Sequence, residues 1–227
     1  MKNLEIYIHI PFCVRKCEYC DFLSFPADDD AKLRYVKGIM AEMIFYGPLM
    51  KNYQVSSVYI GGGTPSSIDE QWTAALMEGV FDCFNVLPDA EISIECNPGT
   101  LSREKLLAYR DAGINRLSIG LQSANNDELK LLGRIHTFEQ FVTNYEVARN
   151  VGFKNINVDL MYGLPGQSAS QYMATVNKII RLHPDHISAY SLIVEKGTPF
   201  YEKYKFDMVR QEAGMRTEFL PNEDELY

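Results

Sequence analysis

The sequence has no long apolar run and no excess of positive charge. No stretch among its 227 residues approaches the ~18 consecutive apolar residues that a membrane-spanning helix needs. The chain starts on a strand-like pattern instead of a charged region followed by an apolar stretch, so we expect no export signal. The net charge of -8 argues against a general nucleic-acid-binding protein, which needs a basic face. We therefore expect a cytoplasmic protein with no membrane span and no nucleic-acid partner.

Cysteine is also scarce, but its distribution is uneven. The chain has 5 cysteines, and three of them, Cys13, Cys17 and Cys20, form a Cys-x3-Cys-x2-Cys motif after an apolar, strand-like run. An odd cluster of three does not indicate a disulfide framework, and the count fits a reducing compartment. Cys83 and Cys96 are isolated, and we expect them to behave as small buried hydrophobic residues.

Three thiolates on one short loop predict a metal site. Iron–sulfur clusters are normally held by four cysteine thiolates, so three at close spacing suggest a cluster with one iron open to a ligand. A structural zinc site needs four closed ligands, and only His9 lies nearby to complete it. In order of preference, the interpretations are an open cluster, zinc and unrelated thiols.

The rest of the chain alternates strand-like and helix-like segments. The apolar fraction of 46% and the length suit one large domain with a sizeable core. Capping patterns at Asp28–Asp30, Ser67 with Glu70, Ser102, Thr137 with Gln140, and Ser168 with Gln171 predict the starts of helices. These helices are expected to end near residues 50, 84, 113, 152 and 182, with a short one over 127–132. The predicted strands are 4–10, 55–60, 91–96, 116–121, 156–161 and 186–192.

Strands separated by helices indicate repeated βαβ units and a parallel sheet. The distinctive polar residues follow successive strands at their carboxyl ends, and in a barrel these ends converge on one mouth. A flat sheet would scatter them. We therefore predict an α/β fold, a partial (β/α)6 TIM-like barrel that is open along one side.

A glycine loop follows the second predicted strand. Gly61, Gly62 and Gly63 would admit a close approach between backbone and ligand, and Thr64 adds a hydroxyl group. A tight strand-to-helix turn explains the same glycines equally well. The loop lacks the Lys-[Ser/Thr] element of a phosphate-binding Walker loop.

Two carboxylates follow later strands. Glu95 ends an apolar strand, where it can pair with an ammonium group or simply face solvent. Asp159 lies within an apolar strand, where an unpaired charge would be costly, so a ribose diol or a structural arginine is its expected partner. Gln122 and Arg134 are weaker candidates, which could equally be ordinary loop residues.

At this point the motifs resemble a known family. The cysteine motif with a Gly-Gly-Thr-Pro loop is similar to the radical SAM superfamily. Further segments resemble the oxygen-independent coproporphyrinogen III oxidases and the related radical SAM haem chaperones of the HemW type. These segments are Tyr7–Cys13, Gly62–Ser66, Ser118–Ser123, Gly133–His136, Asp159–Gly166 and His186–Tyr190.

The resemblance implies a radical SAM core with a 4Fe–4S cluster on Cys13, Cys17 and Cys20. S-adenosylmethionine would bind the open iron, and its cleavage would release a 5′-deoxyadenosyl radical. The resemblance places ten residues at or near these groups: Tyr7 near the cluster; Tyr19 beside the adenine, with Met161 at its border; Gly62, Gly63 and Thr64 at the methionyl end; Glu95 also at the ligand; and Gln122, Arg134 and Asp159 at its polar parts.

Two departures refine the expectation. The decarboxylating oxidases carry a further cysteine two residues after the third, whereas Asp21 and Phe22 follow Cys20 here, as in the chaperones. The resemblance implies a further C-terminal domain in the family, and we expect that domain to be missing here. We therefore expect a core barrel over residues 1–205 and an acidic tail over 206–227, the start of a truncated C-terminal region.

The resemblance favours a haem chaperone, a protein that binds haem and transfers it to a recipient protein. The alternative is a coproporphyrinogen dehydrogenase-type oxidoreductase, which would convert coproporphyrinogen III to protoporphyrinogen IX by oxidative decarboxylation. Haem or a porphyrinogen is thus the expected partner. The sequence leaves open whether the chain is an enzyme.

Overall fold

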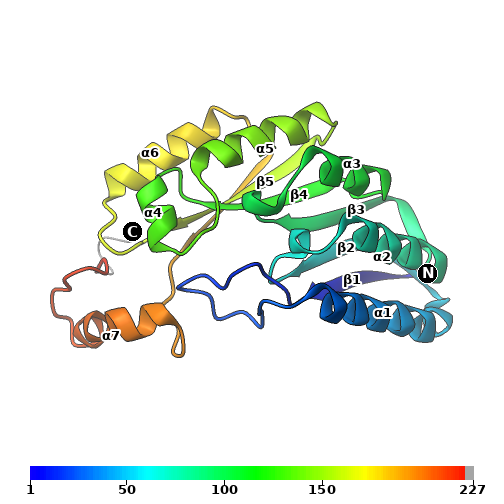
Figure 1. Ribbon diagram of the computed structural model, residues 1–227, viewed down its shortest axis with the longest axis horizontal. Coiled ribbons are helices and arrows are strands. Elements are labelled where there is room, and N and C mark those ends of the chain that lie inside the picture. The colour runs from blue at the N-terminus through cyan, green and yellow to red at the C-terminus, as the bar shows by residue number, and fades with distance from the viewer. Residues whose placement is uncertain (223–227) are drawn as a thin grey trace.

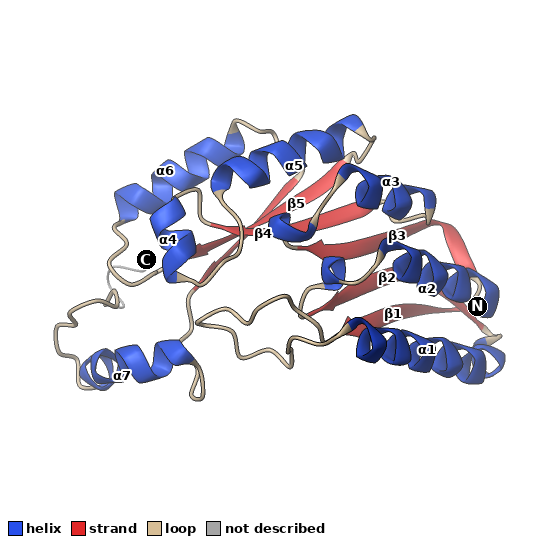
Figure 2. Ribbon diagram, viewed as in Figure 1, coloured by secondary structure: helices blue, strands red, loops and turns tan. Residues whose placement is uncertain are grey.

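The computed structural model describes residues 1–222 of the chain. Its sheet has six parallel strands in the order β1-β2-β3-β4-β5-β6, and it does not close on itself (Figures 1 and 2). The predicted α/β partial barrel is therefore confirmed. The strands are β1 (Lys2–Ile10), β2 (Tyr53–Gly62), β3 (Val86–Cys96), β4 (Arg116–Gln122), β5 (Asn155–Tyr162) and β6 (His186–Ser191).

Helices connect the strands along one side of the curved sheet (Figure 2). The α-helices are α1 (Asp29–Tyr46), α2 (Glu70–Cys83), α3 (Arg103–Asp111), α4 (Asn126–Leu131), α5 (Phe138–Asn150), α6 (Ala169–Ile180) and α7 (Pro199–Glu212). Three short 3-10 helices are η1 (Gly47–Met50), η2 (Pro65–Ser67) and η3 (Pro98–Thr100). Sequence analysis did not predict α7.

Alternation along each strand determines which face is apolar. On β3, for example, Ile92 and Ile94 are buried in the large core between sheet and helices, whereas Ser93 and Glu95 point to the opposite face. Burying each such apolar side chain contributes about 1.5–3 kcal/mol to folding. The inward face is polar on neighbouring strands too, because Glu95 is in register with Ser118.

Most of the predicted helix starts are confirmed. Asp28 and Ser102 accept hydrogen bonds from backbone N–H groups in the first turns of α1 and α3. Full capping boxes open α5 and α6, as predicted from Thr137 with Gln140 and Ser168 with Gln171. Short polar side chains directly before these helices satisfy backbone donors that have no intrahelical acceptor.

One predicted helix start and one predicted helix end were wrong. The capping box of Ser67 with Glu70 does not form, because Asp69 is the N-cap of α2 and accepts from the N–H of Gln71 at 2.8 Å. Ser67 instead donates its hydroxyl to the carbonyl of Phe12. The first helix ends as an α-helix at Tyr46 and continues only as η1, since Pro48 cannot donate a backbone hydrogen bond.

The last part of the described chain packs back on the core. Phe200 and Tyr204 of α7 join a second apolar cluster with Leu220. Asp207 accepts hydrogen bonds from the backbone N–H groups of residues 218, 219 and 220, which fixes this return. The predicted boundary after residue 205 lies inside α7, and residues 223–227 of the predicted tail lie outside the described residues. No helix within residues 1–222 has the length and hydrophobicity required to span a bilayer.

Candidate cofactor site at the mouth of the half-barrel

A cavity of about 470 Å³ lies at the carboxyl ends of the strands. Its lining comes from the cysteine-containing loop after β1 and from residues on or just after the other five strands. The structure thus brings together most of the predicted site residues, as convergence of strand ends in a barrel requires. Those that line the cavity are Cys13, Cys17, Tyr19, Cys20, Gly62, Gly63, Thr64, Glu95, Gln122, Arg134 and Asp159.

All three clustered cysteines face this cavity with free thiols. Cys13 is buried, and burial is the main cause that raises its pKa, with smaller contributions from Cys20 and Cys17. Within residues 1–222, no three His, Cys, Asp or Glu side chains are grouped as ligands of a single metal ion. Three free thiols around one cavity match the thiolate donors of an iron–sulfur cluster, whereas a structural zinc site needs a fourth protein ligand.

Backbone contacts from distant segments hold the loop that carries these cysteines. The N–H of Glu18 donates to the carbonyl of Leu132 at 3.1 Å, and the N–H of Phe200 donates to the carbonyl of Glu18 at 2.9 Å. Arg15 donates to the carbonyl of Gly133 at 2.8 Å. The cysteine loop is therefore braced by the segment after α4 and by the first turn of α7.

The glycine loop is pressed against the same cysteine loop. The N–H of Gly63 donates to the carbonyl of Ile10 at 2.9 Å, and that of Thr64 to the carbonyl of Phe12 at 2.7 Å. A Cβ on Gly63 would lie 2.7 Å from the Phe12 oxygen. Gly62 has φ of +120°, which a residue with a side chain rarely adopts. Contact between the two loops accounts for these glycines before any ligand is considered.

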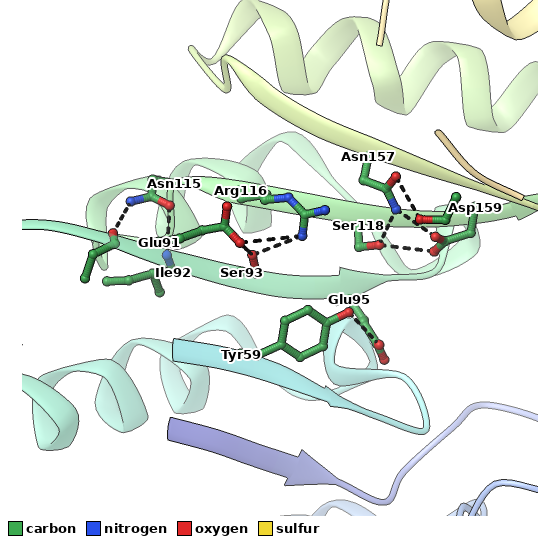
Figure 3. A network of polar contacts seen from close by, with 12 residues as sticks. Tyr59, Glu91, Ile92, Ser93, Glu95, Asn115, Arg116, Ser118, Asn157 and Asp159 are labelled. Carbon is green, nitrogen blue, oxygen red and sulfur yellow. Dashed lines mark hydrogen bonds and ion pairs between the residues drawn. The ribbon is translucent and has the colours of Figure 1, made fainter. Parts of the chain in front are cut away.

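Glu95 is held by neutral donors below the cavity. The Tyr59 hydroxyl donates to Oε1 at 2.8 Å (Figure 3). The N–H of Gly62 donates to Oε2 at 3.1 Å. Desolvation raises the pKa of Glu95, while these two hydrogen bonds act in the opposite direction. No cationic side chain within residues 1–222 forms an ion pair with Glu95, so its charge is available to a cationic ligand.

Asp159 is likewise held without an arginine contact. Ser118 donates to Oδ2 at 3.1 Å and the side-chain amide of Asn157 donates to Oδ1 at 2.7 Å (Figure 3). Burial raises the pKa of Asp159, and hydrogen bonds from Asn157 and Ser118 oppose that rise. The suggested arginine partner is absent among the described ion pairs, and Arg116 acts on Asp159 only as a weaker, more distant charge.

Gln122 and Arg134 complete the wall of the cavity. Gln122 has φ of +75° next to a β-bulge, and its side-chain oxygen accepts from the Tyr190 hydroxyl at 2.7 Å. Arg134 donates to the carbonyl of Gly120 and, at 3.7 Å, to the thiol of Cys17. Its Nε is buried without a hydrogen-bond partner. Backbone strain and an unsatisfied buried donor are features that concentrate at ligand sites.

Two predicted residues do not line the cavity. Tyr7 is 58% exposed, and its hydroxyl lies 3.1 Å from Nδ1 of His9. Met161 is buried in the second apolar cluster, against which Tyr19 packs. As for the isolated thiols, Cys96 is fully buried and Cys83 packs partly buried against the large core.

Sequence analysis missed several cavity residues on the inward face of the strands. The alternation of side chains along the strands could have identified them. Each lies an even number of positions from a predicted residue on the same strand, or is in register with a predicted residue on a neighbouring strand. They are Tyr59, Asn97, Arg116, Ser118, Asn157, Ser188 and Tyr190.

Comparison with known protein families shows which family has this fold and these motifs. The model of the radical SAM superfamily matches residues 7–179. This chain belongs to the radical SAM superfamily. Membership implies a 4Fe–4S cluster and S-adenosylmethionine, and three free thiols, two half-buried carboxylates and an unpaired arginine donor around one cavity fit such groups.

Among curated radical SAM proteins, the chain is 40% identical over 196 residues to "Heme chaperone HemW" of Bacillus subtilis (strain 168), covering 86% of this chain and 52% of that protein. It is 36% identical over 230 residues to "Heme chaperone HemW" of Escherichia coli (strain K12), covering 99% of this chain and 56% of that protein. The chain thus spans about half the length of these relatives.

Solved structures give the same fold. The coproporphyrinogen III oxidase HemN from Escherichia coli, described as a radical SAM enzyme, superposes with a TM-score of 0.85 at 28% identity, covering 99% of this chain and 49% of that one. Streptococcus suis SuiB bound to S-adenosylmethionine superposes with a TM-score of 0.63 at 19% identity, covering 93% of this chain and 48% of that one, which shows a shared fold only.

Proposed function

We propose that this chain is the radical SAM core of a haem chaperone, a protein that binds haem and delivers it to a recipient protein. The observation that carries the proposal is the similarity to curated proteins named "Heme chaperone HemW", at 34–40% identity over 85–99% of this chain. The absence of a cysteine two residues after Cys20 supports the same choice.

In this proposal Cys13, Cys17 and Cys20 hold the 4Fe–4S cluster, and S-adenosylmethionine occupies the rest of the cavity. When bound, these groups supply one-electron chemistry at a sulfonium centre. The chain itself contributes binding, orientation and exclusion of water. The cavity walls limit access of solvent to the bound ligand, a recognised role of enclosed sites.

Charge complementarity supports the assignment of residues within the cavity. Glu95 presents a carboxylate that no cation in residues 1–222 neutralises, which suits the ammonium group of S-adenosylmethionine. Arg134 offers its unpaired Nε to an anionic group such as the ligand's carboxylate. Asp159 lines the same cavity, where its oxygens can accept from ribose hydroxyls, and Gln122 is a further polar residue of the lining.

The roles of the remaining predicted residues follow from the family resemblance and not from contacts in the structure. Gly62, Gly63 and Thr64 are assigned to the methionyl end, Tyr19 to the adenine, Met161 to the adenine border and Tyr7 to the surroundings of the cluster. Of these, Tyr7 and Met161 have the weaker support, because neither lines the cavity.

An oxygen-independent coproporphyrinogen III oxidase is the second candidate. The structural similarity to HemN, with a TM-score of 0.85, favours it. The residues Asp21 and Phe22 after the third cysteine argue against it. Either function places the chain in haem metabolism, with haem or a porphyrinogen as partner. A cytoplasmic location, a haem-recipient protein and the absence of a nucleic-acid partner belong to the same proposal.

Anaerobic reconstitution with iron and sulfide tests the cluster first. We expect about four irons and four sulfides per chain, the composition of a 4Fe–4S cluster, with a brown visible spectrum. Cys17→Ser should abolish the bound iron and sulfide and the visible spectrum. Cys83 lies away from the cavity, so Cys83→Ser is the matched control and should retain them. A colourless protein that binds zinc stoichiometrically would overturn the proposal.

Haem and coproporphyrinogen III then distinguish the two functions. The chaperone proposal expects a haem-dependent change in the visible spectrum and no conversion of coproporphyrinogen III in the presence of S-adenosylmethionine and a reductant. Formation of protoporphyrinogen IX would establish the oxidase instead.

A further inference from the structure

A buried amide lies directly below the carboxylate of Asp159. Asn157 and Asp159 are separated by two positions on β5, so both side chains point to the inward face of the sheet (Figure 3). Both residues border the cavity, but only 1% of Asn157 is exposed, and the more accessible polar group is the carboxylate beyond it. Buried side-chain amides are costly unless their hydrogen bonds are made.

Every polar group of this amide is used, and its partners come from three strands. Its nitrogen donates to Oδ1 of Asp159 at 2.7 Å and to the hydroxyl of Ser118 on β4 at 2.8 Å. Its oxygen accepts from the hydroxyl of Ser188 on β6 at 3.1 Å. Ser118 in turn donates to Oδ2 of Asp159 at 3.1 Å. The amide thus has one workable orientation, because a flip would place its oxygen against the carboxylate.

This arrangement determines the plane of the carboxylate. The terminal torsion of aspartate is broad and roughly two-fold, so an isolated carboxylate rotates easily. Here one donor reaches each oxygen of Asp159: Ser118 binds Oδ2 and Asn157, which is almost fully buried, binds Oδ1. Each carboxylate oxygen can accept more than one hydrogen bond, so further acceptor capacity faces the ligand.

We propose that Asn157 is a positioning residue that orients the Asp159 carboxylate to accept hydrogen bonds from both hydroxyls of a ribose. The inference rests on the proposed function, in which the cavity binds S-adenosylmethionine. Asn157 does not touch the ligand in this scheme; it acts through Asp159. The three-strand network is the reason that a nucleoside with a vicinal diol is preferred over a deoxynucleoside.

Isothermal titration of anaerobically reconstituted protein tests this directly. The probes are S-adenosylhomocysteine and its 2′-deoxy and 3′-deoxy analogues. Hydrogen bonds to a charged group correspond to about tenfold to hundredfold in affinity, so wild-type protein should prefer the ribose form by at least about tenfold. Asn157→Ala should reduce that preference severalfold, because a carboxylate that has lost one of its donors rotates more easily and is aligned less well with both hydroxyls.

Asn155→Ala is the matched control. Asn155 is the same residue type on the same strand and face, two positions before Asn157, and it does not line the cavity. It should keep the full ribose preference. A general loss of sheet stability would lower affinity for all three probes together, whereas a positioning role changes their ratio.

Ser188→Ala is the second variant, for use if Asn157→Ala fails to fold in a thermal melt. It removes the donor to the Asn157 oxygen together with a hydroxyl that acts on the Asp159 carboxylate, and it should also lower the ribose preference. An unchanged ratio in Asn157→Ala, or in Ser188→Ala if the first variant is unfolded, overturns the inference. Wild-type protein that binds the probes without ribose preference also overturns it, whereas wild-type protein that binds none of them refutes the proposed function itself.

Discussion

The two sides of the cavity are built in different ways. On the β1–β3 side, the cysteine and glycine loops are held by backbone contacts, and the space between them depends on the missing side chain of Gly63. On the β4–β6 side, side chains such as Ser118 and Tyr190 reach across strands to hold Asp159 and Gln122. Added atoms on the first side should therefore disrupt the cysteine loop and its bound cluster. Removal of a single hydrogen bond on the second side should lower ligand affinity only in part.

The largest expected effect is on the backbone-built side. In Gly63→Ala the new Cβ would lie 2.7 Å from the Phe12 oxygen and 2.9 Å from Cβ of Ser24. Relieving this overlap must move the cysteine loop, and overpacking of this kind typically costs about 1–3 kcal/mol. We expect loss of most bound iron after reconstitution and a lower free energy of unfolding.

Gly38→Ala provides the control, because Gly38 lies within α1 and a Cβ there meets nothing within 4 Å. It should stabilise the protein by roughly 0.5–1 kcal/mol, as an alanine in a helix interior does. Equal iron content in Gly63→Ala and Gly38→Ala would refute the account of the loop contact.

On the β4–β6 side, Asp159→Asn should change the free energy of unfolding and the ligand affinity in opposite directions. Because burial raises the folded-state pKa of Asp159, the charged carboxylate costs stability above that pKa, and the cost disappears as the pH falls through it. The neutral variant should therefore be at least as stable as wild type at pH 7.5, with a difference that shrinks toward acid pH. Its affinity for S-adenosylmethionine should fall about tenfold or more, since a charge-assisted hydrogen bond is lost.

Denaturant unfolding of ligand-free protein at two pH values and titration with the ligand measure both quantities. Asp89→Asn, on an exposed part of β3, is the control and should change neither. A variant that loses stability at pH 7.5 while keeping its affinity would show that Asp159 is a structural residue.

A smaller effect is expected where one neutral hydrogen bond is removed. Tyr190→Phe deletes the hydroxyl that donates to Gln122 at 2.7 Å and leaves the ring in place. A typical intramolecular hydrogen bond contributes about 0.5–1.5 kcal/mol, so affinity for S-adenosylmethionine should fall severalfold without loss of iron. Tyr46→Phe, on the exposed end of α1, should leave affinity unchanged. An effect of Tyr190→Phe on iron content would contradict the view that the β4–β6 side contributes to ligand affinity and not to cluster binding.

The smallest effect concerns His136, which lies behind the cavity wall. Its Nδ1 is 3.2 Å from Oδ1 of Asn97, and burial together with the charge of Arg134 lowers its pKa to about 3. The imidazole should stay neutral, so its NMR resonances should not shift between pH 8 and pH 5. Because the unfolded chain takes up this proton near pH 6.5, the free energy of unfolding should also decline as the pH falls below that value. A titration of His136 above pH 5 in the folded protein would contradict its burial.

Much of the fold was predictable because it depends on short-range patterns. Alternating residues such as Ile92 and Ile94 mark the strands, and capping residues such as Thr137 mark helix starts. The helix α7 was not predicted, because its buried residues Phe200 and Tyr204 pack on segments that are distant in the sequence. The cap at Asp69 was missed because a neighbouring serine offered an equally plausible pattern.

The cavity was predictable only in part for a similar reason. Cys17 or Asp159 stands out by type or by its apolar surroundings in the sequence. Asn157 and Ser188 are ordinary residues that become informative once β5 and β6 are known to be neighbours in a fixed register. The left-handed backbone of Gln122 could not be predicted, since it follows from a bulge between β4 and β5.

The hydrogen bonds of Glu18 have a consequence for biosynthesis. This residue lies between the second and third cysteines of the loop, yet its backbone partners are Leu132 and Phe200. A ribosome releases the cysteines early, but the braces that shape their loop emerge only when nearly the whole barrel has been translated. We therefore expect the cluster to be inserted after synthesis of the barrel, once residues 132 and 200 are in place around the cysteine loop.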